Sequence, residues 1–414
     1  MLWLTLLFAG VLAAATSIRW WLAARQIAAV RAHRDRVPPL FRDSVALDEQ
    51  QKAADYAAAR VRLGRLGALV DAALALALTL GGGIAAVDAA WRQTGWNQPW
   101  LGAAVISTVL FLMTLVRLPL GLWRTFELEA RFGFNRVSPA LFAADFGKQL
   151  LLALIVGGPP LLALLALMQH VGRWWWLAAW AGWLLVTFAI TWAWPRFIAP
   201  LFNRFTPLED AALVTRIEAL LERCGFASQG LFVMDGSRRS AHGNAYFTGV
   251  GRNKRVVFFD TLIERLDAAE VEAVLAHELG HFRLHHVRRR LAVSWATALA
   301  AFALLAWLAA RPEFYTAFGV PVPSAHAALL VFLAAGPAFV FFFTPLGAWW
   351  SRRHELAADD FAVAHANAGA LATALVKLYR GNAATLTPDP VHSAFYDSHP
   401  PALVRIARLS AHVS

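Results

Sequence analysis

Charged residues are scarce in this chain of 414 residues: Asp, Glu, Lys and Arg make up 16% of it, where a soluble domain carries about a quarter. Cysteine occurs once, as Cys224, which excludes an internal disulfide and a cysteine-rich metal site. By contrast, hydrophobic residues make up 58% of the chain, with 18 Trp and 28 Phe. A lipid bilayer is the simplest place to bury so much apolar surface.

Long apolar runs recur along the sequence, and a helix of about 20 such residues crosses a hydrocarbon layer of about 30 Å. Residues 101 to 116 show no polar face, whereas a helix of a soluble bundle has one apolar stripe. We therefore predict a mainly α-helical polytopic membrane protein. Gly81 to Gly83 are expected to bend or pack the second of its helices rather than to bind phosphate. The seven expected membrane helices lie at about 2 to 21, 66 to 90, 101 to 122, 150 to 169, 174 to 195, 291 to 310 and 326 to 350.

The formal net charge is +11, and the basic residues gather in the connections between apolar runs. Loops 22 to 65 and 123 to 149 are rich in Arg and Lys, while the alternate connections carry one arginine each. Short basic loops tend to stay in the cytoplasm, which places the N-terminus outside and both the HELGH segment and the C-terminus inside. The pattern suits contact with membrane lipids, and no nucleic-acid partner is expected. Removal of the first run as a signal peptide, and the oligomeric state, stay open.

Two stretches are polar enough to fold in water or at the membrane surface. The expected division of the chain is five membrane helices in 1 to 195, a polar segment that contains the sequence HELGH in 196 to 290, membrane helices six and seven in 291 to 350, and a C-terminal segment in 351 to 414.

The first polar stretch predicts strands followed by a helix. Residues 231 to 235, 244 to 250 and 255 to 259 are rich in β-branched and aromatic residues, and the last two read as a hairpin around Gly251 to Lys254. Asp267, followed three residues later by Glu270, predicts a helix N-cap and its capping partner.

The motif HELGH occupies residues 277 to 281, in the helix that this cap opens. His277 and His281 are four residues apart, so on a helix they share one face, where two imidazoles can bind one Zn²⁺. In this arrangement Glu278 does not bind the metal but takes the proton from the zinc-bound water. The motif therefore indicates a zinc hydrolase.

A catalytic zinc site needs a third protein ligand and an open position for water. The longer motif HExxHxxGxxH is excluded, because Leu284 and Val287 stand where it requires Gly and His. His285 and His286 are weak candidates, because at this helical spacing they turn away from the ligand face or lie a turn beyond it.

Glu355 is the better candidate for the third ligand, on the helix that continues from the seventh membrane run. Asp359 lies four residues further on the same helical face and could hydrogen-bond the far nitrogen of a liganding histidine. Taken alone, the pair could equally be two solvent-exposed acids.

Several segments together resemble the CAAX prenyl protease 1 (Ste24-type) family of zinc metalloproteases, peptidase family M48. The resemblance runs from about residue 120 to 410. The segments that carry it are HELGH at 277 to 281, SRRHELAAD at 351 to 359, AHGNAYFTGVGRNKRVVFFDTLI at 241 to 263, SHPP at 398 to 401, FGFN at 132 to 135 and FNRFTPL at 202 to 208.

The resemblance implies one Zn²⁺ per chain, held by His277, His281 and Glu355, with Glu278 as general base. It implies membrane helices that enclose a water-filled chamber, joined to a zincin-like α+β catalytic domain. It also implies that His399 points into the site, where a histidine donor could stabilise a developing oxyanion.

The resemblance further implies an edge strand along which an extended substrate peptide lies. Arg405 is expected to pair with Asp359. The residues of the implied substrate-binding strand are Asn244, Ala245 and Tyr246.

The expected function is that of an integral membrane zinc metalloendopeptidase, which hydrolyses peptide bonds by zinc-activated water. Its substrate would be a peptide or protein, with or without a lipid modification. Two alternatives stay open: a membrane quality-control protease that clears misfolded or stalled chains, and a non-catalytic zinc-containing transporter or scaffold.

Overall fold

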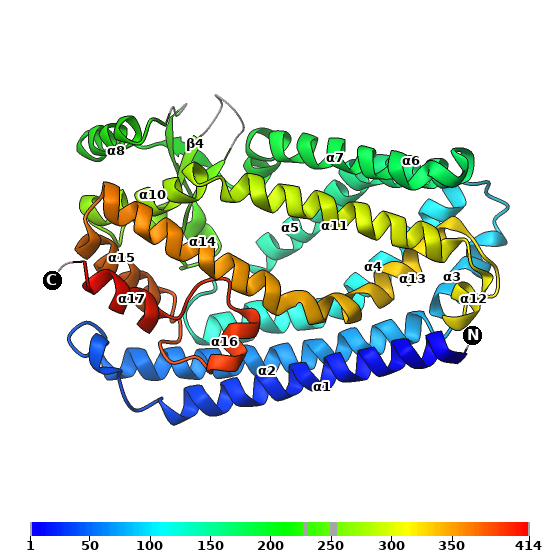
Figure 1. The fold of residues 1–414 in the computed structure, drawn as a ribbon, viewed down its shortest axis with the longest axis horizontal. Coiled ribbons are helices and arrows are strands. Elements are labelled where there is room, and N and C mark those ends of the chain that lie inside the picture. The colour runs from blue at the N-terminus through cyan, green and yellow to red at the C-terminus, as the bar shows by residue number, and fades with distance from the viewer. Residues whose placement is uncertain (1, 227–229, 249–254, 413–414) are drawn as a thin grey trace.

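The computed structural model describes residues 2–226, 230–248 and 255–412. Figure 1 shows long helices running beside one another, with shorter helices and a small sheet gathered at one end of the molecule. In the described residues, six helical segments are long and apolar enough to cross a membrane, and a bent helix pair makes a seventh. The predicted polytopic helical fold is confirmed.

Each predicted membrane run overlaps one of these segments. Three of the segments include a short π-helix: η2 (Trp123–Glu129), η3 (Ala153–Gly157) and η5 (Trp194–Ile198). In chain order the segments are α1 (Leu2–Ala32); the pair α2 (Leu47–Leu78) and α3 (Gly83–Arg92); α4 (Trp100–Leu122) with η2 (Trp123–Glu129); α5 (Pro139–Leu152), η3 (Ala153–Gly157) and α6 (Gly158–His170); η4 (Gly172–Trp174), α7 (Trp175–Ala193), η5 (Trp194–Ile198) and η6 (Ala199–Leu201); α11 (His286–Ala309); and α13 (Ala325–Val340), η8 (Phe341–Phe343) and α14 (Thr344–His365).

The second membrane segment bends by 51° between α2 and α3. Gly82 at the break has a φ of 74°, a left-handed conformation that glycine adopts without strain. A Cβ atom on Gly81 or on Gly83 would lie 2.8 Å from the carbonyl oxygen of Ala77. The three glycines therefore bend the helix, as the sequence predicted.

The elements outside the membrane segments are short. They are η1 (Pro39–Phe41), β1 (Phe205–Pro207), α8 (Ala211–Arg223), β2 (Leu231–Met234), η7 (Gly236–Arg238), β3 (Ala245–Thr248), β4 (Arg255–Phe259), α9 (Asp260–Ile263), α10 (Ala268–Arg283), α12 (Pro312–Ala317), α15 (Ala368–Gly381), α16 (Pro390–Tyr396) and α17 (Ala402–Ser410).

The sheet has the strand order β1-β2-β4-β3, with β2 and β4 parallel and the other two pairs antiparallel. The three predicted strands are all present, and β3 lies at an edge, as expected. The predicted turn from Gly251 to Lys254 lies outside the described residues. The sequence missed β1, because a three-residue strand that ends in proline gives almost no periodic signal.

Helix α10 begins with the predicted capping box. The Asp267 carboxylate accepts hydrogen bonds from the backbone N–H groups of Ala269 and Glu270, and the Glu270 carboxylate accepts one from the Asp267 N–H. Lys377 of α15 also donates to Glu270 at 2.6 Å. The start of α10 is therefore fixed to its neighbour α15.

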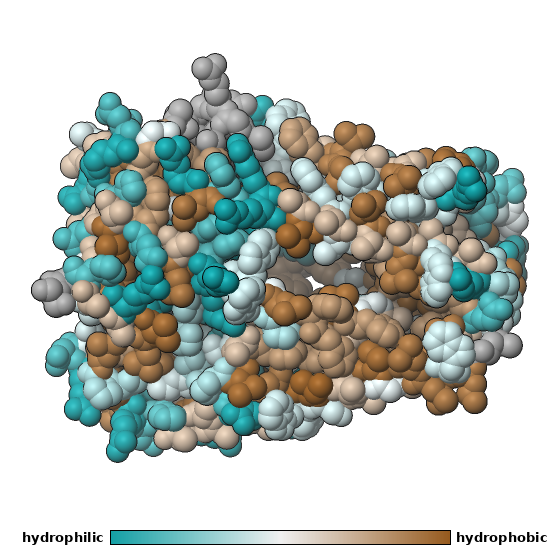
Figure 2. Space-filling model, in the orientation of Figure 1, coloured by the Kyte–Doolittle hydropathy of each residue, from teal (hydrophilic) through white to brown (hydrophobic). Residues whose placement is uncertain are grey.

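The two largest apolar cores lie in different parts of the molecule. One lies among α8, the sheet, α10, α15 and α17, and the other lies among the membrane helices. Figure 2 shows hydrophobic side chains over the long helices, hydrophilic ones over the end with the sheet, and a hollow between the helices. Such a hollow is what the expected chamber requires.

Helices α10 and α14 approach each other closely at Gly280. A Cβ atom at this position would lie 3.0 Å from the Cα atom of Ala358 and 3.0 Å from the Cβ atom of Phe361. Glycine at position 280 therefore sets the spacing between the helix of HELGH and the helix of Glu355.

We predict that Gly280→Val destabilises the protein by about 1 to 3 kcal/mol, because the added atoms must push two packed helices apart. The apparent unfolding temperature in detergent measures this effect. Gly336→Val on α13 is the control, since a Cβ atom there meets nothing within 4 Å. Equal unfolding temperatures for the two variants would contradict the role of Gly280.

Candidate active site

Three potential metal ligands meet between α10 and α14. His277 and His281 lie one helical turn apart on α10, and Glu355 comes from α14. Each of the three residues offers one potential ligand atom, and these three atoms all lie within 4.8 Å of one another. The structure thus brings together the three side chains that the sequence singled out.

The potential ligand atoms lie close enough together for one Zn²⁺. The two Nε2 atoms are 3.3 Å apart, Oε2 of Glu355 lies 3.4 Å from Nε2 of His277, and Oε1 of Glu355 lies 3.2 Å from Nε2 of His281. Ligands at about 2.0 to 2.1 Å from a tetrahedral Zn²⁺ are separated by about 3.3 to 3.4 Å. The three side chains can therefore hold this ion with little rearrangement.

Asp359 and Arg405 lie directly behind His277. The Asp359 carboxylate is 2.8 Å from Nδ1 of His277, and Arg405 on α17 donates to the same carboxylate, with Nε at 2.9 Å. All three side chains are buried. Because a buried charge must be paired, Arg405 allows Asp359 to stay ionised and to fix the orientation of the His277 ring. The pairing of Asp359 with Arg405 that the sequence predicted is present.

The groups around His277 favour a positive charge on its ring. Burial, the largest influence, lowers the pKa of His277, but hydrogen bonds with Asp359 and Glu355 outweigh it and raise the pKa to about 9. A site that favours a positive charge on this ring also favours a metal cation between the same groups.

Glu278 is partly buried and faces the same group of side chains. Burial raises the pKa of its carboxyl above the ordinary value, although the neighbouring His277 and His281 oppose this shift. A carboxylate whose pKa lies closer to neutrality is a better proton acceptor in catalysis.

His281 has a partner that the sequence did not reveal. Its Nδ1 lies 3.0 Å from Nδ1 of His286, and the His286 ring stacks on that of His354 with centroids 3.9 Å apart. The prediction treated the HELGH helix as continuous, but α10 ends at Arg283 and His285 turns the chain with a φ of 59°. This turn brings His286 back to the far nitrogen of His281, outside the group of ligand atoms.

His399 reaches the site from the segment between α16 and α17. Its Nδ1 lies 2.6 Å from a Glu355 carboxylate oxygen, and 62% of its side chain is exposed. Arg352 on α14 positions this segment by donating to the backbone carbonyls of Asp397 at 2.8 Å and Ala394 at 3.1 Å. His399 thus contacts Glu355 through Nδ1 while most of its side chain stays exposed.

Strand β3 carries two of the residues predicted to bind substrate, and Asn244 directly precedes it. Ala245 is buried against the core, whereas Asn244 is exposed. The Tyr246 hydroxyl points to the sulfur of Met234 at 3.9 Å. The strand contacts α10, the helix of HELGH, and among the described residues no strand pairs with its edge opposite β4.

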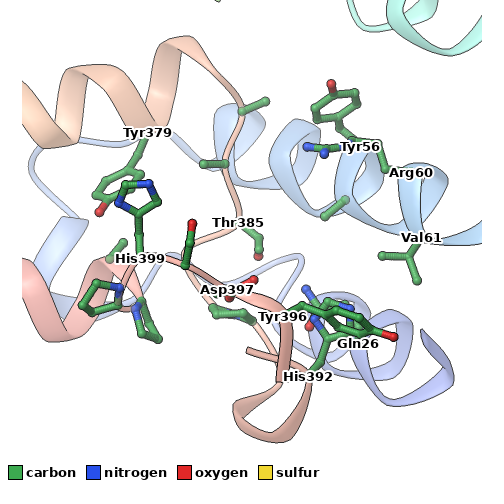
Figure 3. Close-up of a pocket in the computed structure, with 18 residues that line it drawn as sticks. Gln26, Tyr56, Arg60, Val61, Tyr379, Thr385, His392, Tyr396, Asp397 and His399 are labelled. Carbon is green, nitrogen blue, oxygen red and sulfur yellow. The ribbon is translucent and has the colours of Figure 1, made fainter. Parts of the chain in front are cut away.

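A cavity of about 580 Å³ adjoins His399. Figure 3 shows Tyr379 and His399 on one side of it and residues of α2 on the other. A second cavity, of about 840 Å³, lies beside Tyr246 and is mostly walled by apolar residues of α5, η3, α7 and η5.

Two family profiles match successive parts of the chain. The profile described as CAAX prenyl protease N-terminal, five membrane helices, matches residues 26–204, and that of Peptidase family M48 matches residues 207–413. The chain belongs to peptidase family M48. It is a membrane-embedded metalloprotease, and this assignment favours peptide hydrolysis over a transporter or scaffold.

Similar members of the M48 family cover most of the chain. The CAAX prenyl protease 1 homolog of Arabidopsis thaliana is 35% identical over 76% of this chain and 77% of its own length. CAAX prenyl protease 1 of Saccharomyces cerevisiae is 35% identical, with coverages of 72% and 69%. The crystal structure of S. mikatae Ste24p superimposes with a TM-score of 0.89 at 28% identity and covers 98% of both chains. The predicted resemblance is confirmed.

For this M48 protein, we predict that Asp359→Asn weakens Zn²⁺ binding about 10- to 100-fold, because the His277 ring loses its charged partner. Competition against a chromophoric chelator, with the purified protein in detergent, measures the affinity.

Asp360→Asn is the matched control for this prediction. Asp360 is the next residue on α14, but it is exposed and pairs with Arg408 at 2.7 Å, away from the histidines. Equal Zn²⁺ affinities for Asp359→Asn and Asp360→Asn would contradict the role of Asp359.

Proposed function

We propose that the protein hydrolyses peptide bonds with one Zn²⁺ per chain, held by His277, His281 and Glu355. The observation that carries this proposal is the meeting of two Nε2 atoms, 3.3 Å apart, with the Glu355 carboxylate, whose Oε2 lies 3.4 Å from His277 and whose Oε1 lies 3.2 Å from His281. When bound, Zn²⁺ supplies a Lewis acid that polarises the scissile carbonyl and acidifies water.

Glu278 is the proposed general base. Its carboxylate takes the proton of the attacking water and passes it to the nitrogen of the leaving amine. Burial raises the pKa of Glu278. A raised pKa supports this role, since the carboxylate must first accept a proton from water and then release it to the amine.

His399 is the proposed donor to the oxygen of the scissile carbonyl. The Glu355 carboxylate only accepts hydrogen bonds, so Nδ1 of His399 carries a proton in their contact. Nε2 is then the atom available to the substrate, and it donates when the ring carries both protons.

The free edge of β3 is the proposed binding surface for the substrate backbone. An extended peptide that adds to this edge through Asn244, Ala245 and Tyr246 would present its scissile bond at a fixed register to the metal site. The exposure of Asn244 and the contact between β3 and α10 support this arrangement.

The substrates that we propose are peptide chains, including chains that carry a prenyl group. The relatives are named as CAAX prenyl proteases, and the apolar cavity beside Tyr246 lies next to the proposed peptide surface. This cavity is the proposed place for the hydrocarbon chain.

We also propose, from the distribution of Arg and Lys, that the catalytic segments and the C-terminus face the cytoplasm.

The test is digestion of a peptide panel, with and without a farnesyl group, by the wild type and by Glu278→Gln. We expect Glu278→Gln to lower kcat/KM about 100- to 10,000-fold, the range typical for loss of a general base, while Zn²⁺ stays bound at one ion per chain.

Glu218→Gln on α8 is the control, because this glutamate is exposed and far from the ligands in the sequence. It should leave kcat/KM unchanged. If the wild type holds Zn²⁺ but cleaves no peptide, or if Glu278→Gln keeps full activity, the proposed function is wrong.

A further inference from the structure

A small cavity of about 230 Å³ lies where α1, α2 and α16 meet. Its polar lining comes from Arg19 of α1, Arg65 of α2, and His392 and Tyr396 of α16, and its other lining residues are alanine, valine and glycine. Figure 3 shows His392 and Tyr396 on the same short segment, with Val61 of α2 across from them. Two arginines from neighbouring helices thus line one cavity that the proposed catalysis does not use.

The cavity lies at the end of two membrane segments. Arg19 stands in the last turn of the first predicted apolar run, 2 to 21, and Arg65 directly precedes the second run, 66 to 90. The side chains of Trp20 and Trp21 beside Arg19 are exposed. Because tryptophan gathers where the hydrocarbon layer meets water, the cavity lies at the depth of the lipid head groups.

Neither arginine has an anionic partner. In the part of the chain that the structure describes, Arg19 and Arg65 make no ion pair and no hydrogen bond. Each stacks on a ring instead: the guanidinium carbon of Arg19 lies 4.5 Å from the ring centroid of Phe341, and that of Arg65 lies 3.6 Å from the ring centroid of Trp20. Stacking uses the face of a guanidinium and leaves the N–H groups in its plane free to donate.

Two buried nitrogens beside the cavity also lack a partner. Nε of Arg65 and Nδ1 of His392 are both buried, and no hydrogen-bond partner is found for either among the described residues. Buried polar atoms are normally paired, so an unpaired N–H of an arginine favours an acceptor from outside the protein.

The acids near α16 do not compensate these cations. The described residues that line the cavity include no Asp or Glu. Asp389, directly before α16, is paired with Arg25 at 2.9 Å, and Asp397, directly after it, lines the neighbouring cavity beside His399. The cavity therefore presents a net positive charge.

We propose that this cavity binds the phosphate group of a membrane phospholipid through Arg19 and Arg65. The fork of N–H groups on each arginine matches the oxygens of a phosphate. The volume, about 230 Å³, is below the range of about 300 to 1,000 Å³ for sites of larger ligands, which favours a small ionic group. The acyl chains would lie along exposed leucines of α2 such as Leu66 and Leu69.

This binding site goes beyond the proposed function and does not depend on it. A lipid bound there would contact α1, α2 and α16 together. Since α16 precedes the segment that carries His399, the lipid would tie this segment to the first two membrane helices.

The test measures lipid binding to the full-length protein in detergent by native mass spectrometry. The wild type is titrated with phosphatidylglycerol and, separately, with a diacylglycerol that has the same acyl chains but no phosphate. We expect the first phosphatidylglycerol to bind about 10- to 100-fold more tightly, as charge-assisted hydrogen bonds predict. Inorganic phosphate should compete weakly, because it lacks the apolar contacts of the chains.

Arg19→Gln and Arg65→Gln should each weaken the binding of phosphatidylglycerol about 10-fold or more and leave that of diacylglycerol unchanged. Gly64→Leu should also weaken it while keeping both arginines, because a Cβ atom at this position meets nothing within 4 Å and the leucine can occupy the cavity. Arg62→Gln is the matched control, since Arg62 is an exposed arginine of α2 that does not line the cavity. The unfolding temperature without added lipid checks that each variant folds.

Equal affinities of the wild type for phosphatidylglycerol and diacylglycerol would overturn the inference. So would an unchanged affinity for phosphatidylglycerol in Arg19→Gln and Arg65→Gln, or an equal loss in Arg62→Gln, which would indicate an effect of net charge alone. If inorganic phosphate displaces the lipid at equal concentration, the site binds free phosphate, and the assignment to a lipid is wrong.

Discussion

The close packing of α10 against α14 is the constraint on which the site depends. His277 and His281 are fixed relative to each other by one turn of α10, but Glu355 joins them only because Gly280 lets α14 approach. Since α14 continues from α13 through η8, the third potential ligand is attached to a membrane segment. The geometry of the candidate metal site is therefore coupled to this membrane segment, and a shift of the segment would change the separation of the potential ligands.

Buried charge holds this arrangement together and makes it sensitive to single changes. His277, Glu355, Asp359 and Arg405 are all buried, so their charges must be balanced within the cluster. Arg405 supplies one positive charge to two carboxylates, and the raised pKa of His277 indicates that the cluster favours a further positive charge beside them. A divalent cation between the histidines and Glu355 would supply that charge. These groups thus form a candidate site for a metal.

The sequence predicted those parts of the structure that depend on local pattern. HELGH, the capping box of α10 and the apolar runs are periodic signals, and Glu355 with Asp359 followed from spacing on one helix and from family resemblance. The sequence did not reveal the contact of His286 with His281, because it depends on α10 ending at Arg283 and on the turn at His285. The cavity that Arg19, Arg65 and His392 line could not be predicted either, since segments more than 300 residues apart form it.

The proposed function requires one Zn²⁺ that is bound by two imidazoles and one carboxylate, with a position left open for water. Zinc-edge X-ray absorption of the purified protein, loaded with one equivalent of the ion, measures the number and type of ligands most directly. We predict two histidine nitrogens at about 2.0 to 2.1 Å, with the remaining ligands oxygen and none sulfur. Three or more histidine ligands, with His286 or His399 completing a closed site, would contradict it.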